Sequence, residues 1–476
     1  MKTPFIGGAN TAYSINVASN RLVNLYAEKT DLGAKDIAAL YGTPGLRLLA
    51  TVGTGPCRGF HVKGSKLFMV SGSELYEINT ALTATLMGTV SGSGQVSMDD
   101  NRTQVFIAAN PDGYIYNTST LVFGQITDPD FPGAGKVGFI DQYFLFTDPN
   151  TQNFWITALL DGTSIDPLDF AAAEGSPDDI VSMIIDHREV WLFGENATEV
   201  FYNSGNADFP FQRMDGAFIE HGCAAADSVA KMNNSVFWLS ADPRGNGIVF
   251  RADGYTPQRI STHAIENAIR GYSTISDAIA YTYQQSGHAF YVLSFPSGNA
   301  TWVYDASTTL WHERAYMDPA TGNLERHRSQ CHAFFAGMHI VGDHQNGKIY
   351  ELDQDTYTDN GEELKALRSW RALPSGENKG GEVFYNNLKV DCETGVGLVT
   401  GQGSNPQLML RYSDNGGHTW GNEQWETMGA IGEYSARVEF WRLGSSYGDN
   451  RVFELAVTDP VKRAFIAADL DYEKGT

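Results

Sequence analysis

The chain has few positive charges and no long apolar run. Its 476 residues contain 33 Lys and Arg against 56 Asp and Glu, which gives a net charge of −23 at pH 7. General affinity for nucleic acid requires clustered Lys and Arg that displace counterions, so this charge balance argues against it. No stretch approaches 18 uninterrupted apolar residues, so we expect no membrane span.

Cysteine is also scarce. Residues 1–5 lack the apolar core and small-residue cleavage site of a secretory signal, so we expect no signal peptide. The chain has only four cysteines, which lie far apart with no CxxC pair: Cys57, Cys223, Cys331 and Cys392. Such spacing is typical of reduced, structural thiols in a protein made in a cytoplasm.

Short aromatic strands recur throughout the middle of the chain. Between Lys66 and Leu352, a strand, a polar turn and a second strand repeat six or seven times. The equivalent positions are 38 to 54 residues apart: Phe68, Phe106, Phe144, Trp191, Phe237, Tyr291 and Ile340. A period of about 40–50 residues made only of hairpins is typical of a β-propeller. The sequence therefore predicts an all-β fold with a six- or seven-bladed propeller over residues 56–360.

The N-terminal residues 1–55 precede the first repeat. Residues 21–28 alternate well enough for one strand, and residues 43–46 form a turn that leads into the propeller. We expect this leading segment to pair with the last blade or with the C-terminal module, because such pairing hides the edges of a ring of sheets. One helix is expected over residues 263–272, capped by Ser261 or Thr262.

A second pattern begins after the last repeat. Residues 353–363 and 374–381 are polar and indicate linkers. From residue 382 onward, longer alternating strands separated by turns predict an antiparallel β-sandwich-like domain over residues 361–476. We place the domain boundary near residue 360.

One motif of the C-terminal part is a folding device. Residues 413–420 follow the S-x-D-x-G-x-T-W pattern of the Asp-box hairpin found in sialidase propellers, with Asn415 in place of the aspartate. In such a hairpin the polar side chain caps the turn and Trp420 packs beneath it. The motif occurs once and outside the repeats, so we interpret it as structural.

Other clusters of chemically active residues lack the spacing that catalysis or metal binding needs. Asp353, Asp355 and Asp359 resemble a calcium loop but fail the EF-hand template. Asp186, His187 and Ser228 occur without a G-x-S-x-G elbow. The remaining candidates lack HExxH or paired zinc-ligand spacing: His312, Glu313, His327, Cys331, His332 and His344. We therefore expect no catalytic, cofactor-binding or metal-binding residues, no cofactor and no enzymatic activity.

Several segments, in order along nearly the whole chain, resemble the tail-nozzle proteins of short-tailed bacteriophages, also called packaged-DNA stabilisation or tail-hub proteins. The segments are residues 21–28 (RLVNLYAE) with 43–46 (TPGL), 94–98 (GQVSM), 260–272 (ISTHAIENAIRGY), 302–307 (WVYDAS) with Trp311, 412–420 (YSDNGGHTW) and 441–444 (WRLG).

This resemblance implies a structural protein of the virion tail, made and assembled in the bacterial cytoplasm. It implies a ring, usually of six copies, beneath the portal and its head-to-tail adaptor. Further partners would be tail needle, tip or fibre proteins. The lumen would retain the packaged double-stranded DNA and conduct it during ejection. The acidic composition agrees with a lumen that contacts DNA weakly or repels it.

Two other functions stay open from the sequence. A propeller can bind a host glycan or protein through its loops. It can also act as a glycosidase if two carboxylates lie about 5–9.5 Å apart in a central cleft. The low charged fraction of 19% and the additional sandwich favour the structural role.

Overall fold

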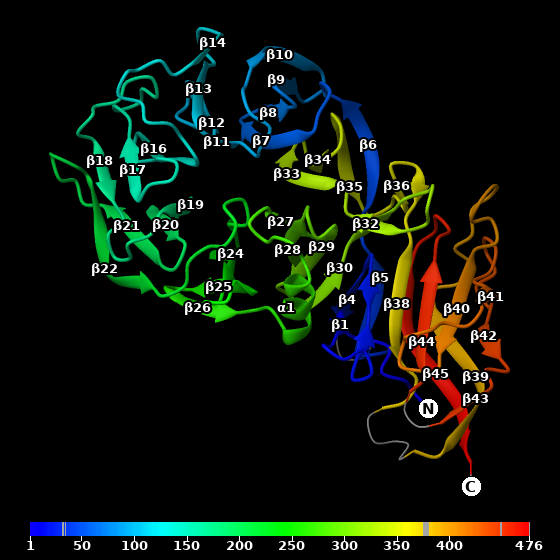
Figure 1. Ribbon diagram of the computed structural model, residues 1–476. Coiled ribbons are helices and arrows are strands. Elements are labelled where there is room, and N and C mark those ends of the chain that lie inside the picture. The colour runs from blue at the N-terminus through cyan, green and yellow to red at the C-terminus, as the bar shows by residue number, and fades with distance from the viewer. Residues whose placement is uncertain (31–32, 34, 375–379, 448–449, 476) are drawn as a thin grey trace.

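The computed structural model describes residues 1–30, 33, 35–374, 380–447 and 450–475, and nearly all of its regular structure is β-sheet. In the described residues, five four-stranded antiparallel sheets and four-stranded parts of two larger sheets surround one axis as the seven blades of a propeller, and a β-sandwich lies beside it (Figure 1). The all-β propeller-plus-sandwich fold expected from the repeats is confirmed. No helix among these residues is long and apolar enough to cross a membrane.

The first five blades are each built from four consecutive strands. Blade 1 contains β7 (Cys57–Lys63), β8 (Lys66–Ser71), β9 (Glu74–Asn79) and β10 (Ala84–Thr89). Blade 2 contains β11 (Ser97–Asp100), β12 (Gln104–Ala109), β13 (Asp112–Asn117) and β14 (Val122–Gln125). Blade 3 contains β15 (Val137–Ile140), β16 (Tyr143–Thr147), β17 (Asn153–Ile156) and β18 (Phe170–Ala172). Blade 4 contains β19 (Ile180–Asp186), β20 (Glu189–Gly194), β21 (Thr198–Asn203) and β22 (Phe211–Ile219). Blade 5 contains β23 (Ala230–Met232), β24 (Ser235–Ala241), β25 (Gly247–Asp253) and β26 (Thr256–Arg259).

The last two blades pair with strands from the N-terminal part of the chain. Blade 6 contains β27 (Ile279–Gln285), β28 (His288–Phe295), β29 (Ala300–Asp305) and β30 (Leu310–Glu313). Blade 7 contains β33 (Ser329–Phe335), β34 (Met338–Asp343) and β35 (Lys348–Asp353), and its outermost strand is the N-terminal β6 (Gly45–Thr51). Short hairpins flank these blades: β31 (Ala315–Met317) with β32 (Leu324–Arg326), and β36 (Thr358–Asp359) with β37 (Glu362–Glu363).

The aromatic repeat forms the packed interior of the propeller. The equivalent residues all lie on the second strand of a blade and are at most 4% exposed: Phe68, Phe106, Phe144, Trp191, Phe237, Tyr291 and Ile340. Their rings and side chains pack between neighbouring blades, as with Phe106 and Phe144, whose ring centroids are 5.5 Å apart. The spacing of the aromatic repeat along the sequence therefore reflects the packing of one equivalent core residue in each blade.

The sandwich combines both ends of the chain, which lie side by side in Figure 1. One sheet contains β3 (Leu22–Val23), β38 (Ala366–Arg371), β44 (Val452–Val457), β40 (Gln407–Ser413) and β41 (Gln424–Thr427). The other contains β4 (Leu25–Lys29), β5 (Ala38–Gly42), β45 (Ala464–Lys474), β39 (Glu382–Cys392), β42 (Val438–Trp441) and β43 (Ser445–Tyr447). A small hairpin of β1 (Asn10–Thr11) and β2 (Ser19–Asn20) precedes them.

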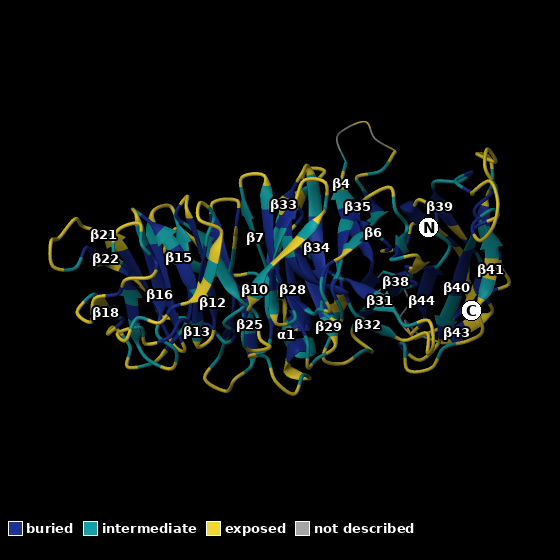
Figure 2. Cartoon of the chain, turned by 90° about the horizontal axis from the view of Figure 1, so that it is seen from above, coloured by how far each residue is buried: buried dark blue, intermediate teal, exposed yellow. Residues whose placement is uncertain are grey.

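The first of these sheets has no break from the propeller. β3 pairs in parallel with β30 of blade 6 and antiparallel with β38, so nine strands run from β27 to β41 as one sheet. Buried strands accordingly continue through propeller and sandwich in Figure 2, with exposed residues mainly in the loops. The propeller and the sandwich are therefore joined by backbone hydrogen bonds as well as by linkers.

The single strand expected over residues 21–28 is wrong, because Asn24 divides it. Asn24 has a φ of 51°, a left-handed conformation that asparagine tolerates better than most residues. The turn sends β3 into one sheet and β4 into the other. At the next turn, a Cβ on Gly45 would lie 2.2 Å from the Thr356 carbonyl oxygen, so this position requires glycine.

The expected helix is present as α1 (His263–Arg270). Thr262 is its N-cap and Gly271 its C-cap, and Ile265 and Ile269 are buried beneath it. Residues 353–363, expected as a linker, include β36 and β37. The second expected linker, residues 374–381, falls largely on residues 375–379, which lie outside the described residues.

Candidate functional site

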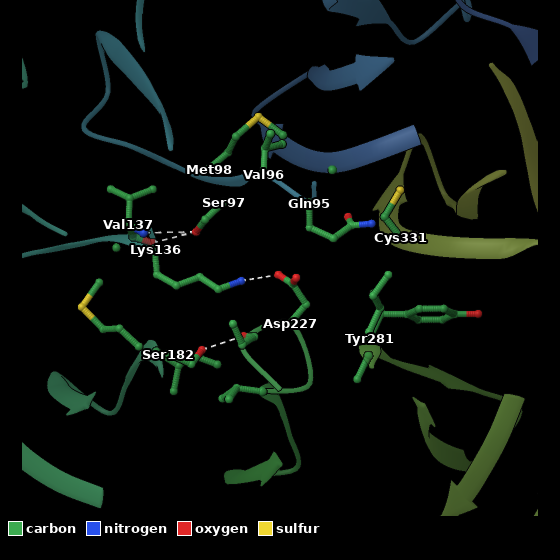
Figure 3. A pocket seen from close by; sticks show the side chains of 18 of the residues that line it. Gln95, Val96, Ser97, Met98, Lys136, Val137, Ser182, Asp227, Tyr281 and Cys331 are labelled. Carbon is green, nitrogen blue, oxygen red and sulfur yellow. Dashed lines mark hydrogen bonds and ion pairs between the residues drawn. The ribbon is translucent and has the colours of Figure 1, made fainter. Parts of the chain in front are cut away.

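The axis of the propeller contains a cavity of about 380 Å³, and each of the seven innermost strands contributes to its wall (Figure 3). The wall consists largely of small, apolar or uncharged polar side chains. Its charged residues are two acids and two bases: Asp99, Lys136, Asp227 and Lys231. The axial cavity is thus close to neutral, although the chain is strongly acidic.

The charged groups of the cavity are already bound to other groups. The Lys136 ammonium pairs with the Asp227 carboxylate across the wall (Figure 3), and Lys231 Nζ donates to the Ile185 carbonyl at 2.8 Å. Ser182 Oγ donates to the Ala226 carbonyl at 2.8 Å. These contacts join blades 3, 4 and 5, so we interpret the cavity primarily as a packed axis that stiffens the propeller.

The residues considered as a serine triad do not act together. Ser228 is buried; its hydroxyl donates to the Ala225 carbonyl at 2.8 Å and accepts from Leu239 N at 3.1 Å. His187 instead pairs with its neighbour Asp186, Nδ1 to Oδ2 at 2.7 Å, on an exposed turn. Since the serine hydroxyl is bound to backbone groups, this arrangement supplies no activated nucleophile.

The histidines expected to be structural lie in or against the core near blade 7. Burial lowers the pKa of His327 and His332 to about 3 and that of His344 to about 4. His327 Nδ1 contacts Ser329 Oγ at 2.6 Å, and His332 Nε2 contacts His339 Nδ1 at 3.1 Å. Burial also holds the pKa of His312 well below its usual value. These imidazoles are neutral near pH 7. His327 and His332 have side-chain partners, whereas His312 Nε2 is buried without a hydrogen-bond partner among the described residues.

The aspartates that resemble a calcium loop in the sequence make separate contacts in the structure. Asp353 accepts from Asp355 N at 3.1 Å and from the Thr356 hydroxyl at 2.8 Å, and it contacts Arg47. Asp359 is fully buried 2.9 Å from Arg328 Nε. Its burial raises the pKa to about 7, against the opposing effect of Arg328. One carboxylate thus forms a turn and another an internal ion pair.

The Asp-box-like hairpin has the geometry expected of a capped turn. Asn415 Oδ1 accepts from Thr419 N at 2.9 Å, and Asn415 Nδ2 donates to Thr419 Oγ1 at 2.8 Å. Ser413 Oγ accepts from Gly417 N at 2.9 Å. Trp420 lies beneath the Arg411 guanidinium, 5.0 Å from ring centroid to Cζ. The hairpin packs on the N-terminal segment, since a Cβ on Gly416 would touch Asn16.

Most of the segments quoted from the sequence lie where the propeller meets the sandwich, whereas residues 94–98 lie at the start of blade 2, and 95–98 line the axial cavity. We call the joint between propeller and sandwich the seam: residues 1–29, blade 6 and α1, and strands β38, β40 and β44. Arg368 is buried there and donates to the carbonyls of Phe5 and Gly8, at 2.7 and 3.2 Å. Trp311 Nε1 donates to the Ile260 carbonyl at 2.9 Å.

Asn24 binds both sides of the seam. Its Nδ2 donates to the carbonyls of Ala315 and Lys365, both at 2.8 Å, and its Oδ1 accepts from Ala315 N at 3.0 Å. The N-terminal motif therefore acts as the structural element that fixes the sandwich to blade 6. Its role is architectural, and the described residues around it carry no catalytic constellation.

The fold is a seven-bladed propeller that an N-terminal strand closes, and its sheet continues into a β-sandwich built from both ends of the chain. Such a fold, without a catalytic constellation among the described residues, is that of a structural protein. The chain belongs to the family described as bacteriophage P22 Gp10: the β-propeller model matches residues 1–357, and the β-sandwich model matches residues 372–473. This is a family of short-tailed phage tail proteins tied to DNA stabilisation. The resemblance stated from the sequence is confirmed, and the chain is a structural protein of a phage tail.

Solved structures that resemble the chain have low sequence identity to it. The WD40 domain of Neurospora crassa Pan2 is 8% identical; the match covers 62% of this chain and 89% of that one, with a TM-score of 0.42. The N-terminal domain of Nup159 is 9% identical, covering 70% and 99%, with a TM-score of 0.43. Among curated proteins, none matches this chain in sequence.

Proposed function

We propose that the chain forms a ring of six copies below the portal and adaptor of a short-tailed phage. In this ring it retains the packaged DNA and conducts it during ejection, without an enzymatic step. The single observation that carries the proposal is family membership over both propeller and sandwich. The continuous nine-stranded sheet supports it, because a wall that resists the pressure of packaged DNA needs rigid joints.

The placement of the positive charges supports weak contact with DNA. Among the described residues, at least fourteen Lys and Arg side chains are in ion pairs with carboxylates. Four further arginines are buried: Arg58, Arg314, Arg368 and Arg463. Cations engaged in this way are poorly placed to release counterions from a duplex. A ring of such subunits would repel DNA over a Debye length of about 8 Å and let it slide.

The sandwich carries apolar side chains suited to assembly. Phe384 on β39, Trp441 on β42 and Tyr447 on β43 are 43%, 55% and 68% exposed. Their neighbours Tyr385, Phe440 and Ser446 are buried, so the three rings share the outer face of one sheet. Exposed apolar groups gathered on one face are typical of interaction sites. We assign this face to contact with the neighbouring subunit in the ring.

The proposal is tested by the mass of the purified protein, alone and mixed with a portal–adaptor ring. We expect a hexamer in at least the mixture, and weak binding of duplex DNA at ~150 mM salt. A chain that stays monomeric in both samples contradicts the ring. Tight binding of DNA by assembled rings contradicts the low-friction lumen while leaving the ring itself intact. Binding of host glycan by the monomer would favour a host-surface recognition protein.

A further inference from the structure

His61, Asp99 and Asp100 gather on the innermost strands of blades 1 and 2. His61 lies on β7, and the two aspartates end β11. One ligand atom from each residue lies within 4.8 Å of the others, and all three residues are half-buried. Asp99 also lines the axial cavity, and Asp100 lines a separate hollow beside Lys63 and Arg102. The group therefore occupies the wall between the cavity and the outside.

Outer contacts hold both carboxylates in place. Asp100 Oδ2 is 2.9 Å from His61 Nε2, while its Oδ1 accepts from Lys63 Nζ at 2.7 Å and from Arg102 N at 3.1 Å. Asp99 accepts from Asp100 N at 2.8 Å and from Phe139 N, in blade 3, at 2.7 Å. Hydrogen bonds of this kind orient ligands in metal sites and fix their reactive atoms. Lys63 can keep its contact while Asp100 Oδ2 binds an ion.

The distances suit a small divalent cation. Two ligands at adjacent corners of an octahedron with bonds of about 2.1 Å are about 3 Å apart, close to the 2.9 Å between His61 Nε2 and Asp100 Oδ2. One imidazole with two carboxylates is a donor set for Zn²⁺, Mn²⁺ and related ions, whereas Ca²⁺ and Mg²⁺ prefer oxygen alone. Solvent can supply the remaining ligands, because the site opens into two hollows.

The charge of the group also favours a cation. Two carboxylates face one ammonium, that of Lys63, when the imidazole is neutral. Lys63 Nζ lies against Asp100 Oδ1, whereas the hydrogen bonds to Asp99 come from two backbone amides. Asp99 is thus the carboxylate whose hydrogen bonds among the described residues come from neutral amides and not from a side-chain cation.

We propose that His61, Asp99 and Asp100 bind one divalent first-row transition cation that ties blade 1 to blade 2. Through the bond from Phe139 N to Asp99, the ion also fixes blade 3. The site adds a cross-link where neighbouring blades otherwise meet mainly through side-chain packing. It does not depend on the ring proposed above, since all its ligands come from one chain.

The test uses the full-length protein, stripped with EDTA and titrated with Mn²⁺ while free Mn²⁺ is followed by electron paramagnetic resonance. We expect one Mn²⁺ per chain, displaced by Zn²⁺ but not by an equal concentration of Mg²⁺. His61→Ala and Asp99→Asn should each weaken binding by more than about tenfold. Zn²⁺ should raise the unfolding temperature of the wild type and leave that of both variants unchanged.

His187→Ala is the matched control, because His187 is also paired with an aspartate but lies on an exposed turn. It should bind Mn²⁺ as the wild type does. Equal binding by wild type and His61→Ala, or no binding by the wild type, overturns the proposal. If the variants do not fold, pulsed resonance of Mn²⁺ bound to the wild type decides: coupling to one imidazole nitrogen supports the site, and its absence refutes it.

Discussion

The guanidinium of Arg21 forms two hydrogen bonds with the carboxylate of Glu313, Nε to Oε1 at 3.1 Å and Nη2 to Oε2 at 2.6 Å. Arg21 immediately precedes β3, and Glu313 ends β30, the last strand of blade 6. The pair lies beside the parallel bridge between Val23 and Glu313. A planar, two-point ion pair thus marks the place where the propeller sheet continues into the sandwich.

This pair should strengthen the seam to a modest degree. Arg21→Met and Glu313→Gln should each lower the free energy of unfolding by about 1 kcal/mol, because the Arg21 side chain is 39% exposed and solvent screens the charges. A double-mutant cycle measured by urea denaturation should give a coupling of about 0.5–1 kcal/mol. A coupling of zero would mean that backbone pairing alone holds the two sheets together.

Asn24 should contribute more than Arg21 to the free energy of unfolding. Asn24→Ala removes three hydrogen bonds, two of them buried, and places alanine in a left-handed conformation, so we expect a loss of about 3–5 kcal/mol in unfolding free energy. Asn24→Gly removes the same bonds but tolerates the backbone, and it should lose about 1 kcal/mol less. Equal losses in thermal or urea unfolding would show that the backbone conformation at residue 24 carries no strain.

The propeller could be predicted from the sequence because of its repeat, whereas the strand pairing at the seam could not. Spaced aromatic residues such as Phe68 and Phe106 report the core directly, because each blade repeats the same packing. The division of residues 21–28 between two sheets depends on one left-handed residue, Asn24, and alternation does not reveal it. β38 and β45 each pair with a strand that lies hundreds of residues away near the N-terminus, β3 and β5 respectively. Such pairings leave no local signal.

The candidate metal ligands were missed for a related reason. His61 and Asp99 are 38 residues apart, the same interval that separates Phe68 from Phe106. They therefore occupy equivalent positions on the innermost strands of consecutive blades. Metal motifs are usually sought at short spacing, whereas a propeller brings residues together at the spacing of its blades. Comparison of polar residues at equivalent repeat positions is the signal that would have found them.

Asn415 should stabilise its hairpin without any role in chemistry. Asn415→Ala removes the bonds to Thr419 and should cost about 1–2 kcal/mol. Asn415→Asp keeps the acceptor for Thr419 N and should recover most of that loss. Hydrogen exchange of residues 413–420 is the measurement. Faster exchange confined to this hairpin and to the adjoining N-terminal segment is expected; unchanged exchange would contradict the capping role.

The role of the outer face of the sandwich in subunit contact can be tested by one substitution. Trp441→Ser should reduce assembly of the ring by about tenfold or more in subunit concentration, because it removes a large exposed apolar group from the assigned contact. Its unfolding temperature as a monomer should match the wild type. Trp425→Ser is the control: Trp425 is 59% exposed but lies on β41, in the other sheet. Equal loss of assembly in both variants would contradict the assignment.

His288 and Asp305 should give the fold a pH optimum. His288 Nδ1 lies 2.7 Å from Asp305 Oδ2 within blade 6, and His288 Nε2 lies 3.7 Å from Glu28 of β4. The hydrogen bond to Asp305, opposed by burial, raises the pKa of His288 above 6.5. Burial alone would raise the pKa of Asp305, but the bonds from His288 and Thr308 hold it below 3.8.

The directions of the two pKa shifts define the pH range in which the His288–Asp305 pair stabilises the fold. The contribution of His288 is complete below pH 6.5, the unfolded value, and is lost as the pH rises through its higher folded value. The contribution of Asp305 is complete above pH 3.8 and is lost as the pH falls through its lower folded value. The pair therefore stabilises most between about pH 4 and 6.5.

Asp305→Asn should lower the free energy of unfolding by about 1.5–3 kcal/mol at pH 6, and by less at pH 9, where the imidazole of the wild type is neutral. Urea denaturation of both proteins across this range measures the difference. Glu28→Gln is the milder control, because its carboxylate is 42% exposed and farther from the ring. A difference between wild type and Asp305→Asn that stays constant from pH 6 to pH 9 would show that His288 is neutral in the folded protein throughout.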